Sequence, residues 1–266
     1  MTAFTRTFTV LLLITTACQV RSDRSDEASD ETHTYSETLS QSEVERVTTR
    51  LSMGAGRLIV TGGADQLLEA DFEYNQDSWK PEISFEERKG EGDILVEQPD
   101  FTDDLDIDLD DDQRNEWRIR LNDKVEQVLV CKIGAGQTEL DLRGLSLTRV
   151  DIDAGVGEHE IILTDTSLPE FSLDAGVGEV TIDLTGTWQN NFIAEIDGGI
   201  GELNLKVPAN VGVRLDVSGG LGSVDVPSGY TKDGNTYTNA AYAGADYRLD
   251  IDVDAGLGSI EVEEAG

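Results

Sequence analysis

The chain has 266 residues, of which 54 are Asp or Glu and 20 are Lys or Arg, so its formal net charge is -34 at pH 7. This balance argues against a nucleic-acid partner, because phosphate backbones are bound by clustered Lys and Arg, and it disfavours anionic lipid surfaces as well. An acidic surface is typical of proteins kept soluble by charge, including those adapted to high salt, and a cation-binding role is the alternative.

Residues 1–17 are predicted to be a bacterial lipoprotein signal peptide. Arg6 supplies positive charge, and the apolar run at residues 10–14 is too short to cross a bilayer. The ending Thr15-Thr16-Ala17-Cys18 resembles a lipobox, with Thr15 in place of the commoner Leu. By that resemblance Cys18 carries a lipid anchor, and we expect the protein at the cell envelope, at the outer membrane. A plain secretory signal with an incidental cysteine is the alternative.

Residues 18–43 are rich in Ser, Asp, Glu and Thr and contain few large apolar side chains. Such a segment buries too little surface to offset its ordering entropy, so we expect a disordered acidic tether. Cys131 lies in an apolar run and is expected to be a small buried hydrophobic residue. With Cys18 lipidated, no disulfide can form within the chain.

Residues 44–130 are predicted to form an N-terminal β domain. Strands are expected at 67–74, 82–85, 93–96 and 117–121, between Gly, Pro and Asn or Asp turn signals. Residues 53–56 form a glycine bend followed by a further strand. In the acidic run at 103–112, apolar residues alternate with Asp, and this period of two predicts another strand with one buried face.

Residues 131–266 repeat a glycine bend flanked by alternating strands six times. Measured on the last glycine of each bend, the spacing is 21, 21, 23, 21 and then 36 residues. Such a period indicates a chain wound into stacked, equivalent coils. The six glycines are expected to be structural, because glycine accepts backbone angles that side chains forbid and lets coils approach closely: Gly136, Gly157, Gly178, Gly201, Gly222 and Gly258.

Apolar residues recur five places before each of these glycines and four places after it, and also two places after it except for Thr138 and His159, with mostly polar residues between them. Each coil should therefore be two strands with apolar side chains inside, stacked on the next coil at about 4.8 Å. The predicted fold is all-β, a stacked-coil β-solenoid that is parallel β-helix-like, with coils of about 21 residues.

The segments 53–56, 68–74, 117–121 and 133–142 resemble, in order, those of the toast-rack (LiaF-like) bacterial family. The later bends resemble a wider group of adhesin-like β-solenoid envelope proteins. The resemblance covers about residues 45–266 and implies a stacked β-sheet fold at the cell envelope, with a link to envelope stress sensing. It implies no catalytic residues. LiaF-like members have transmembrane helices, and here a lipid anchor is expected in their place.

Four bends begin with Asp in the same register: Asp153, Asp174, Asp197 and Asp254. Stacked coils would align these carboxylates about 5 Å apart. A divalent cation such as Ca²⁺ could offset their repulsion. The alternative is that each Asp accepts hydrogen bonds from its own bend, with water and salt screening the rest, and no cofactor is otherwise expected.

Catalytic patterns are scarce. The chain has two histidines, His33 in the tether and His159 at an inward-facing position, where a core role is favoured over that of a base. No nucleophile elbow, phosphate loop or Cys/His metal spacing is present in the sequence. A β-helix lyase or hydrolase acting on glycans is the alternative, but the acidic outward positions would repel acidic glycans.

The 36-residue interval contains residues 229–246, predicted to be a loop expansion that protrudes from the side of the stack. It carries Tyr230, Tyr237 and Tyr242 among Gly, Asn and Thr, a composition used for adaptable contacts. It is therefore a candidate recognition loop, and a tolerated insertion is the alternative.

Together the features of the sequence predict a non-catalytic, lipid-anchored envelope protein. It would present a surface for adhesion, for a structural role in the envelope, or for binding an envelope protein or glycan.

Overall fold

The computed structural model describes residues 32–40, 44–99 and 113–265. The predicted signal peptide, Cys18 and the strand predicted at residues 103–112 lie outside these residues. Within the described part of the chain, no helix is long and apolar enough to cross a membrane.

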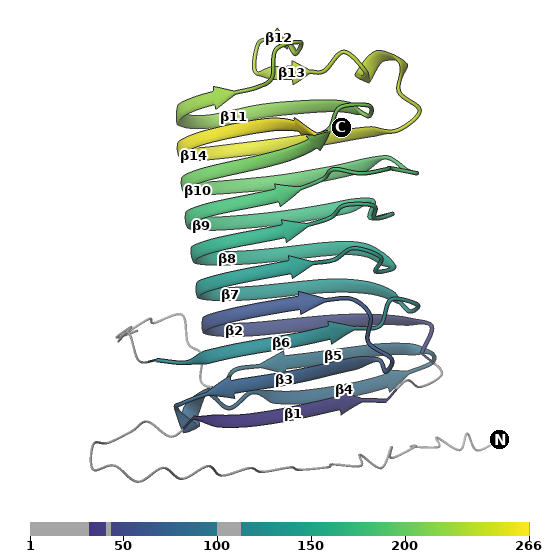
Figure 1. Cartoon of the computed structure of the whole chain (residues 1–266), viewed down its shortest axis with the longest axis vertical. Helices are drawn as coiled ribbons and strands as arrows, with labels where there is room; N and C mark the ends of the chain where they lie inside the picture. Colours follow the sequence, from purple (N-terminus) through teal and green to yellow (C-terminus); the bar gives the residue numbers. More distant parts are fainter. Residues whose placement is uncertain (1–31, 41–43, 100–112, 266) are drawn as a thin grey trace, which may run out of the picture.

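The molecule is built from long strands that each fold back on themselves at a glycine bend. In stacking order they are β2 (Arg46–Thr61), β7 (Glu126–Asp141), β8 (Leu147–Ile162), β9 (Glu170–Asp183), β10 (Phe192–Pro208), β14 (Arg248–Ala265) and β11 (Gly212–Asp225). Each pairs in parallel with the next, and the bends line up along the left edge in Figure 1. The predicted stacked-coil β-solenoid is confirmed.

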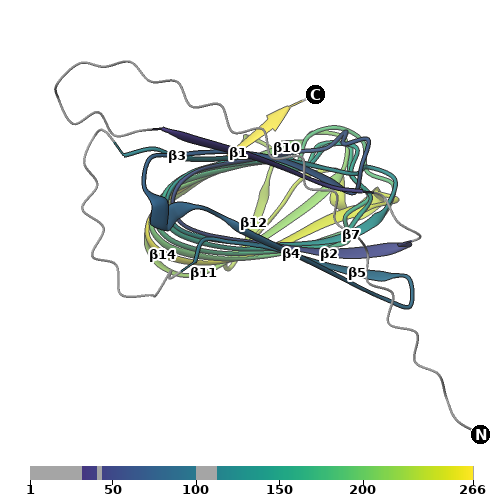
Figure 2. The same cartoon turned by 90° about the horizontal axis from the view of Figure 1, so that it is seen from below.

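Each bent strand has two limbs, so the stack has two β layers that enclose the core, as Figure 2 shows. The inward positions expected from the repeat are buried in most coils: Ile152, Leu173, Ile196 and Val253 before the bends, and Val180, Leu203 and Ile260 after them, are at most 9% exposed. Alternating apolar residues place one face of each limb inside because successive strand side chains point to opposite faces.

At the N-terminal end the two layers continue on separate strands. The first limb of β2 pairs with β5 (Glu91–Glu97), which pairs with β4 (Glu82–Arg88). The second limb pairs with β6 (Asn115–Leu121), followed by β3 (Leu68–Tyr74) and β1 (His33–Leu39), and a short helix η1 (Asp77–Trp79) links β3 to β4. The domain boundary expected at 130/131 falls inside β7, which pairs with β2 along its length.

Strand β1 corrects the predicted tether, which was expected to run through residue 43. Residues 33–39 pair with β3 throughout, and their side chains alternate in burial. The strand is ordered because His33 stacks on Tyr74 and Tyr35 stacks on Phe72, with ring centroids 5.5 and 5.6 Å apart. Two aromatic contacts and a full ladder of hydrogen bonds outweigh the polar composition of the segment.

The C-terminal end also differs from the prediction. The coils do not stack in chain order, since β14 lies between β10 and β11. The segment between β11 and β14 forms the hairpin β12 (Thr231–Asp233) and β13 (Thr236–Thr238), and η2 (Tyr242–Gly244) follows. Because β13 pairs with β11, the expanded segment caps the end of the stack (Figure 1) and does not protrude from its side.

Candidate functional site

The glycine bends pack backbone against backbone. At Gly157 (φ +156°) an added Cβ would lie 1.7 Å from the carbonyl oxygen of Gly136, and at Gly178 (φ +143°) it would lie 1.8 Å from that of Gly157. The same short approach recurs at Gly136, Gly201, Gly222 and Gly258. Side chains are therefore excluded between coils at these glycines. The residue between the two glycines of each bend is the one whose side chain lies at the bend edge.

These intervening residues form an exposed aliphatic row, which we call the bend ridge: Val156, Val177, Ile200 and Leu257. They lie in register on β8, β9, β10 and β14, so neighbours are one strand spacing apart. Each is between 45% and 53% exposed. Single exposed aliphatic residues are ordinary, but a contiguous row on a rigid edge is typical of an interaction site.

Two acidic rows flank the bend ridge. On one side stand Asp153, Asp174, Asp197 and Asp254, and on the other Glu158, Glu179 and Glu202, all exposed. The side chain of Glu158 accepts a hydrogen bond from Gln137 at 3.2 Å, and that of Glu179 accepts one from Asn204 at 3.2 Å. The site thus combines aliphatic side chains with a strongly negative surround.

The predicted register of the four aspartates agrees with the strand pairing, with Ser218 next to Asp254 at the end of the row. Lys132 extends the row at its other end, and its Nζ lies 3.8 Å from an Asp153 carboxylate oxygen. Within the described residues, no cluster of three or more His, Cys, Asp or Glu side chains could hold a metal ion. Binding of Ca²⁺ to this row therefore remains a prediction to which the geometry adds no support.

The three tyrosines of the expanded segment lie in the cap. Tyr237 is 7% exposed and packs in the core, and Tyr230 is partly buried against it. The hydroxyl of Tyr242 donates a hydrogen bond to Asp250 at 2.7 Å, and burial together with this bond raises the pKa of Tyr242. Its ring lies under the Arg248 guanidinium, 5.2 Å from the ring centroid. All three rings have structural contacts, and recognition by this segment remains a prediction.

The histidine and the cysteine of the coils are both internal. His159 is 5% exposed, and burial lowers its pKa. Cys131 is fully buried, and burial raises the pKa of its thiol to about 12. A thiol with so high a pKa is a poor nucleophile, in agreement with the core role expected for Cys131.

The bend ridge was missed from the sequence, although a signal was present. The residue before the last glycine of each bend changes along the stack from Ala55 and Ala135 to Val, Ile and Leu. Strand alternation does not predict which way a side chain points at a bend, so the repeat pattern alone did not place these side chains at the surface.

Comparison with known proteins gives one family. The family model described as "N-terminal domain of toast_rack, DUF2154" matches residues 27–174 and 158–206. None of the curated proteins matches the chain.

The solved structures that are similar to the chain include the following three. A "putative cell adhesion protein" from Clostridium sporogenes is 26% identical with a TM-score of 0.68, over 88% of this chain and 100% of that one. A "putative adhesin" from Bacteroides fragilis is 7% identical with a TM-score of 0.30, over 87% and 97%. A "putative lipid binding protein" from Parabacteroides distasonis is 13% identical with a TM-score of 0.27, over 87% and 96%. Of these three, only the first has a TM-score above 0.5.

Proposed function

The chain belongs to the toast-rack family, and from this premise we propose that it is a non-catalytic protein of the bacterial cell envelope that binds a partner protein through the bend ridge. The observation that carries this proposal is the exposed aliphatic row between two acidic rows. Interfaces use buried apolar anchors for affinity and charge complementarity for orientation and rate of encounter.

The partner is expected to carry a row of aliphatic side chains flanked by Lys or Arg. Aliphatic contacts would cover the bend ridge, and the cations would pair with the Asp and Glu rows. A second copy of this chain fits poorly, because its formal net charge is also -34. Its arginines at the N-terminal end are occupied, as in the pairs Arg50–Asp93 and Arg120–Glu69.

An adhesive role is consistent with the similar structure from Clostridium sporogenes, which bears the name of a cell adhesion protein. The stack supports such a role physically, because a repeat scaffold holds its edge residues in a fixed row. A rigid row needs no ordering on binding, so little conformational entropy opposes association.

The proposed location depends on lipidation of Cys18, which would hold the protein on the outer membrane. Growth with labelled palmitate should label the wild-type chain and leave Cys18→Ala unlabelled. Recovery of an unlabelled wild-type chain in the soluble fraction would contradict the anchor without bearing on the bend ridge.

The ridge is tested with a synthetic peptide that has a row of valines flanked by lysines, called the lysine peptide, and with a counterpart in which glutamates replace the lysines. The lysine peptide should bind the full chain and release as salt is raised, because screening weakens exposed ion pairs. The glutamate peptide should not bind. In the double variant Ile200→Thr/Leu257→Thr, binding of the lysine peptide should fall about tenfold or more, the equivalent of ~1.4 kcal/mol.

Ile193→Thr is the matched control. Ile193 lies on β10 like Ile200 and is 50% exposed, but it stands outside the ridge. It should bind the lysine peptide as the wild type does. Equal loss of binding in this control, or no loss in the double variant, would contradict the assignment of the ridge.

A further inference from the structure

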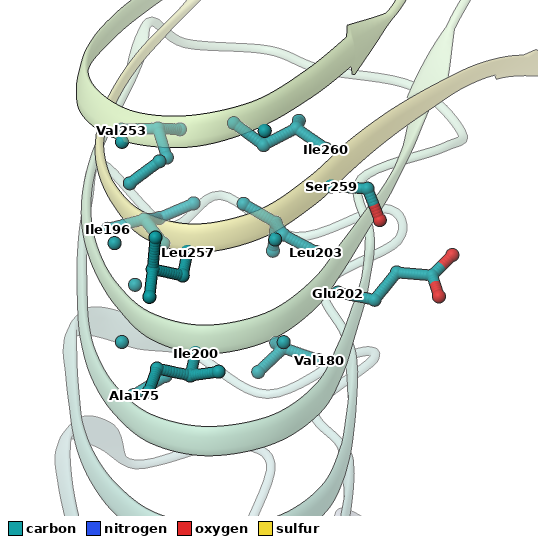
Figure 3. Close-up of a pocket in the computed structure, with 18 of the residues that line it drawn as sticks. Ala175, Val180, Ile196, Ile200, Glu202, Leu203, Val253, Leu257, Ser259 and Ile260 are labelled. Carbon is teal, nitrogen blue, oxygen red and sulfur yellow. The ribbon is translucent and has the colours of Figure 1, made fainter.

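A narrow apolar channel runs along the same bends, and its lining includes the ridge residues Val177, Ile200 and Leu257. Its volume is about 100 Å³, and its lining extends over β8, β9, β10, β14 and β11. Figure 3 shows Ile196 and Val253 facing Leu203 and Ile260 across this space. These four residues are at most 9% exposed, so the core forms this side of the channel, whereas Val177, Ile200 and Leu257 on its other side are 45–53% exposed.

The channel exists because one inward-facing position of the repeat changes from large to small residues partway along the stack. Three places before the last glycine of the bend, β2 carries Met53 and β7 carries Ile133, both at most 2% exposed. In the next five coils the same row is occupied by small residues: Ala154, Ala175, Gly198, Ala255 and Gly219. The side chains of Met53 and Ile133 therefore fill the space inside the bends at the N-terminal end of the stack. Beyond them the small residues leave this space empty.

The small-residue row becomes steadily more accessible toward the end of the stack. Ala154 is 1% exposed, Ala175 and Ala255 are intermediate, and Gly219 on the last coil is exposed. We therefore call the buried end of this row at β8 the closed end of the channel and its exposed end at β11 the open end.

The closed end carries polar atoms without partners. His159 lines the channel there, is 5% exposed, and neither its Nδ1 nor its Nε2 has a hydrogen-bond partner among the described residues. Beside it in register, Thr138 is 1% exposed, and its hydroxyl is likewise unpartnered in the described part of the chain. Buried polar groups are rarely left unpaired, because each costs about 1–3 kcal/mol. His159 in the lining and Thr138 next to it on β7 therefore offer hydrogen-bonding atoms to a ligand at the closed end.

We propose that the channel binds one unbranched aliphatic chain whose small hydrogen-bonding end group pairs with His159 and Thr138. The five coils span about 19 Å at the strand spacing. A volume of about 100 Å³ spread over that length suits a single narrow alkyl chain better than a ring or a branched chain. Fatty acids and fatty alcohols have this chemistry, whereas a phospholipid headgroup is too large for the closed end.

The test titrates the full chain with decanoic acid and 1-decanol, and separately with phospholipid vesicles. The chain has two histidines, so the ring signals of His159 can be followed by NMR with His33 as an internal reference. Decanoic acid or 1-decanol should shift the His159 signals and leave those of His33 unchanged. Vesicles should shift neither.

Ala175→Leu places a larger side chain in the middle of the channel and should weaken binding about tenfold or more, equivalent to ~1.4 kcal/mol. Ala255→Leu, nearer the open end, should still bind hexanoic acid but lose tetradecanoic acid, so one variant remains informative if the other fails to fold. Ala240→Leu, at an exposed alanine of the cap, is the matched control and should bind like the wild type.

Absence of binding by the wild type, full affinity in Ala175→Leu, or saturation without any shift at His159 would each overturn the proposal. The two assignments have separate readouts, because the ridge is tested by salt-dependent binding of the lysine peptide and the channel by the His159 signals. Absence of lysine-peptide binding by the wild type would contradict the ridge alone, and absence of decanoic acid binding would contradict the channel alone.

Discussion

At the scale of single residues, the bends depend on positions where no side chain fits. The carbonyl of one bend occupies the place where the next glycine would carry its Cβ, so the exclusion repeats from coil to coil. The same tight bends turn the aliphatic side chains of Val177 and Ile200 outward and leave His159 enclosed. The fold, the bend ridge and the channel therefore all depend on the same glycine bends.

Gly178→Val is predicted to lower the free energy of unfolding by about 2 kcal/mol or more. The substitution combines a Cβ contact of 1.8 Å with a φ of +143° that a β-branched residue does not tolerate. Thermal or urea unfolding measures the loss. Gly244→Ala is the control, because an added Cβ meets nothing within 4 Å there and should change stability little. An unchanged midpoint for Gly178→Val would refute the stacked bend.

His159→Leu is predicted to stabilise the apo protein, and more so at low pH. The residues that pair with His159 on the neighbouring coils, Thr138 and Val180, are uncharged, and burial lowers the pKa of His159 below 6.5. Around pH 6.5 the unfolded state therefore binds more protons than the folded state, so wild-type stability is lost as the pH falls through this range.

Urea unfolding of wild type and variant between about pH 8 and about pH 6 measures this difference. The stability gain of the variant should grow as the pH falls. A constant difference between the two proteins would show that His159 titrates alike in the folded and unfolded states.

At the scale of elements, periodic segments were predictable from sequence and connections were not. The bends recur at a fixed spacing with alternating flanks, so stacking and inward positions followed directly, and the strands expected at 67–74, 82–85, 93–96 and 117–121 are present. β1 was missed because its order comes from stacking on Tyr74 and Phe72, which are distant in sequence. The place of β14 was missed because equivalent coils can pair in any order.

The segment that caps β11 is held in part by hydrogen bonds of the Asn239 side chain. Asn239 accepts a hydrogen bond from the Val213 N–H at 3.0 Å and donates one to the Val211 carbonyl at 2.8 Å. Its side-chain amide thereby continues the pairing of β13 along the edge of the last coil, which protects this edge against pairing with other chains.

Asn239→Ala is predicted to destabilise the chain by about 1–3 kcal/mol, because it leaves a buried N–H at Val213 without a partner. Hydrogen exchange at the Val213 amide should accelerate while the amides of β8 stay protected. Asn235→Ala, at an exposed position of the same hairpin, is the control and should have little effect. Unchanged exchange at Val213 would contradict the capping role.

At the scale of the whole molecule, charge and shape divide the stack into two regions. Near the N-terminal end, arginines pair with carboxylates, as Arg57 does with Glu139. Among residues 150–213 the one Lys or Arg side chain is Lys206, and this range carries Val156, Val177 and Ile200 of the bend ridge. The molecule therefore presents its aliphatic row where its negative charge is least compensated, which favours a cationic partner.

The most direct test of this account places a photo-crosslinking amino acid at Ile200 on the ridge and, in a second protein, at Ile193 on the same strand. Illumination of the intact envelope should join the Ile200 position to one protein with a lysine- or arginine-rich contact segment, and the yield should fall as salt is raised. The Ile193 position should give no such product. Equal crosslinking at both positions, or a product at Ile200 whose contact segment is acidic, would contradict the bend ridge as the binding surface.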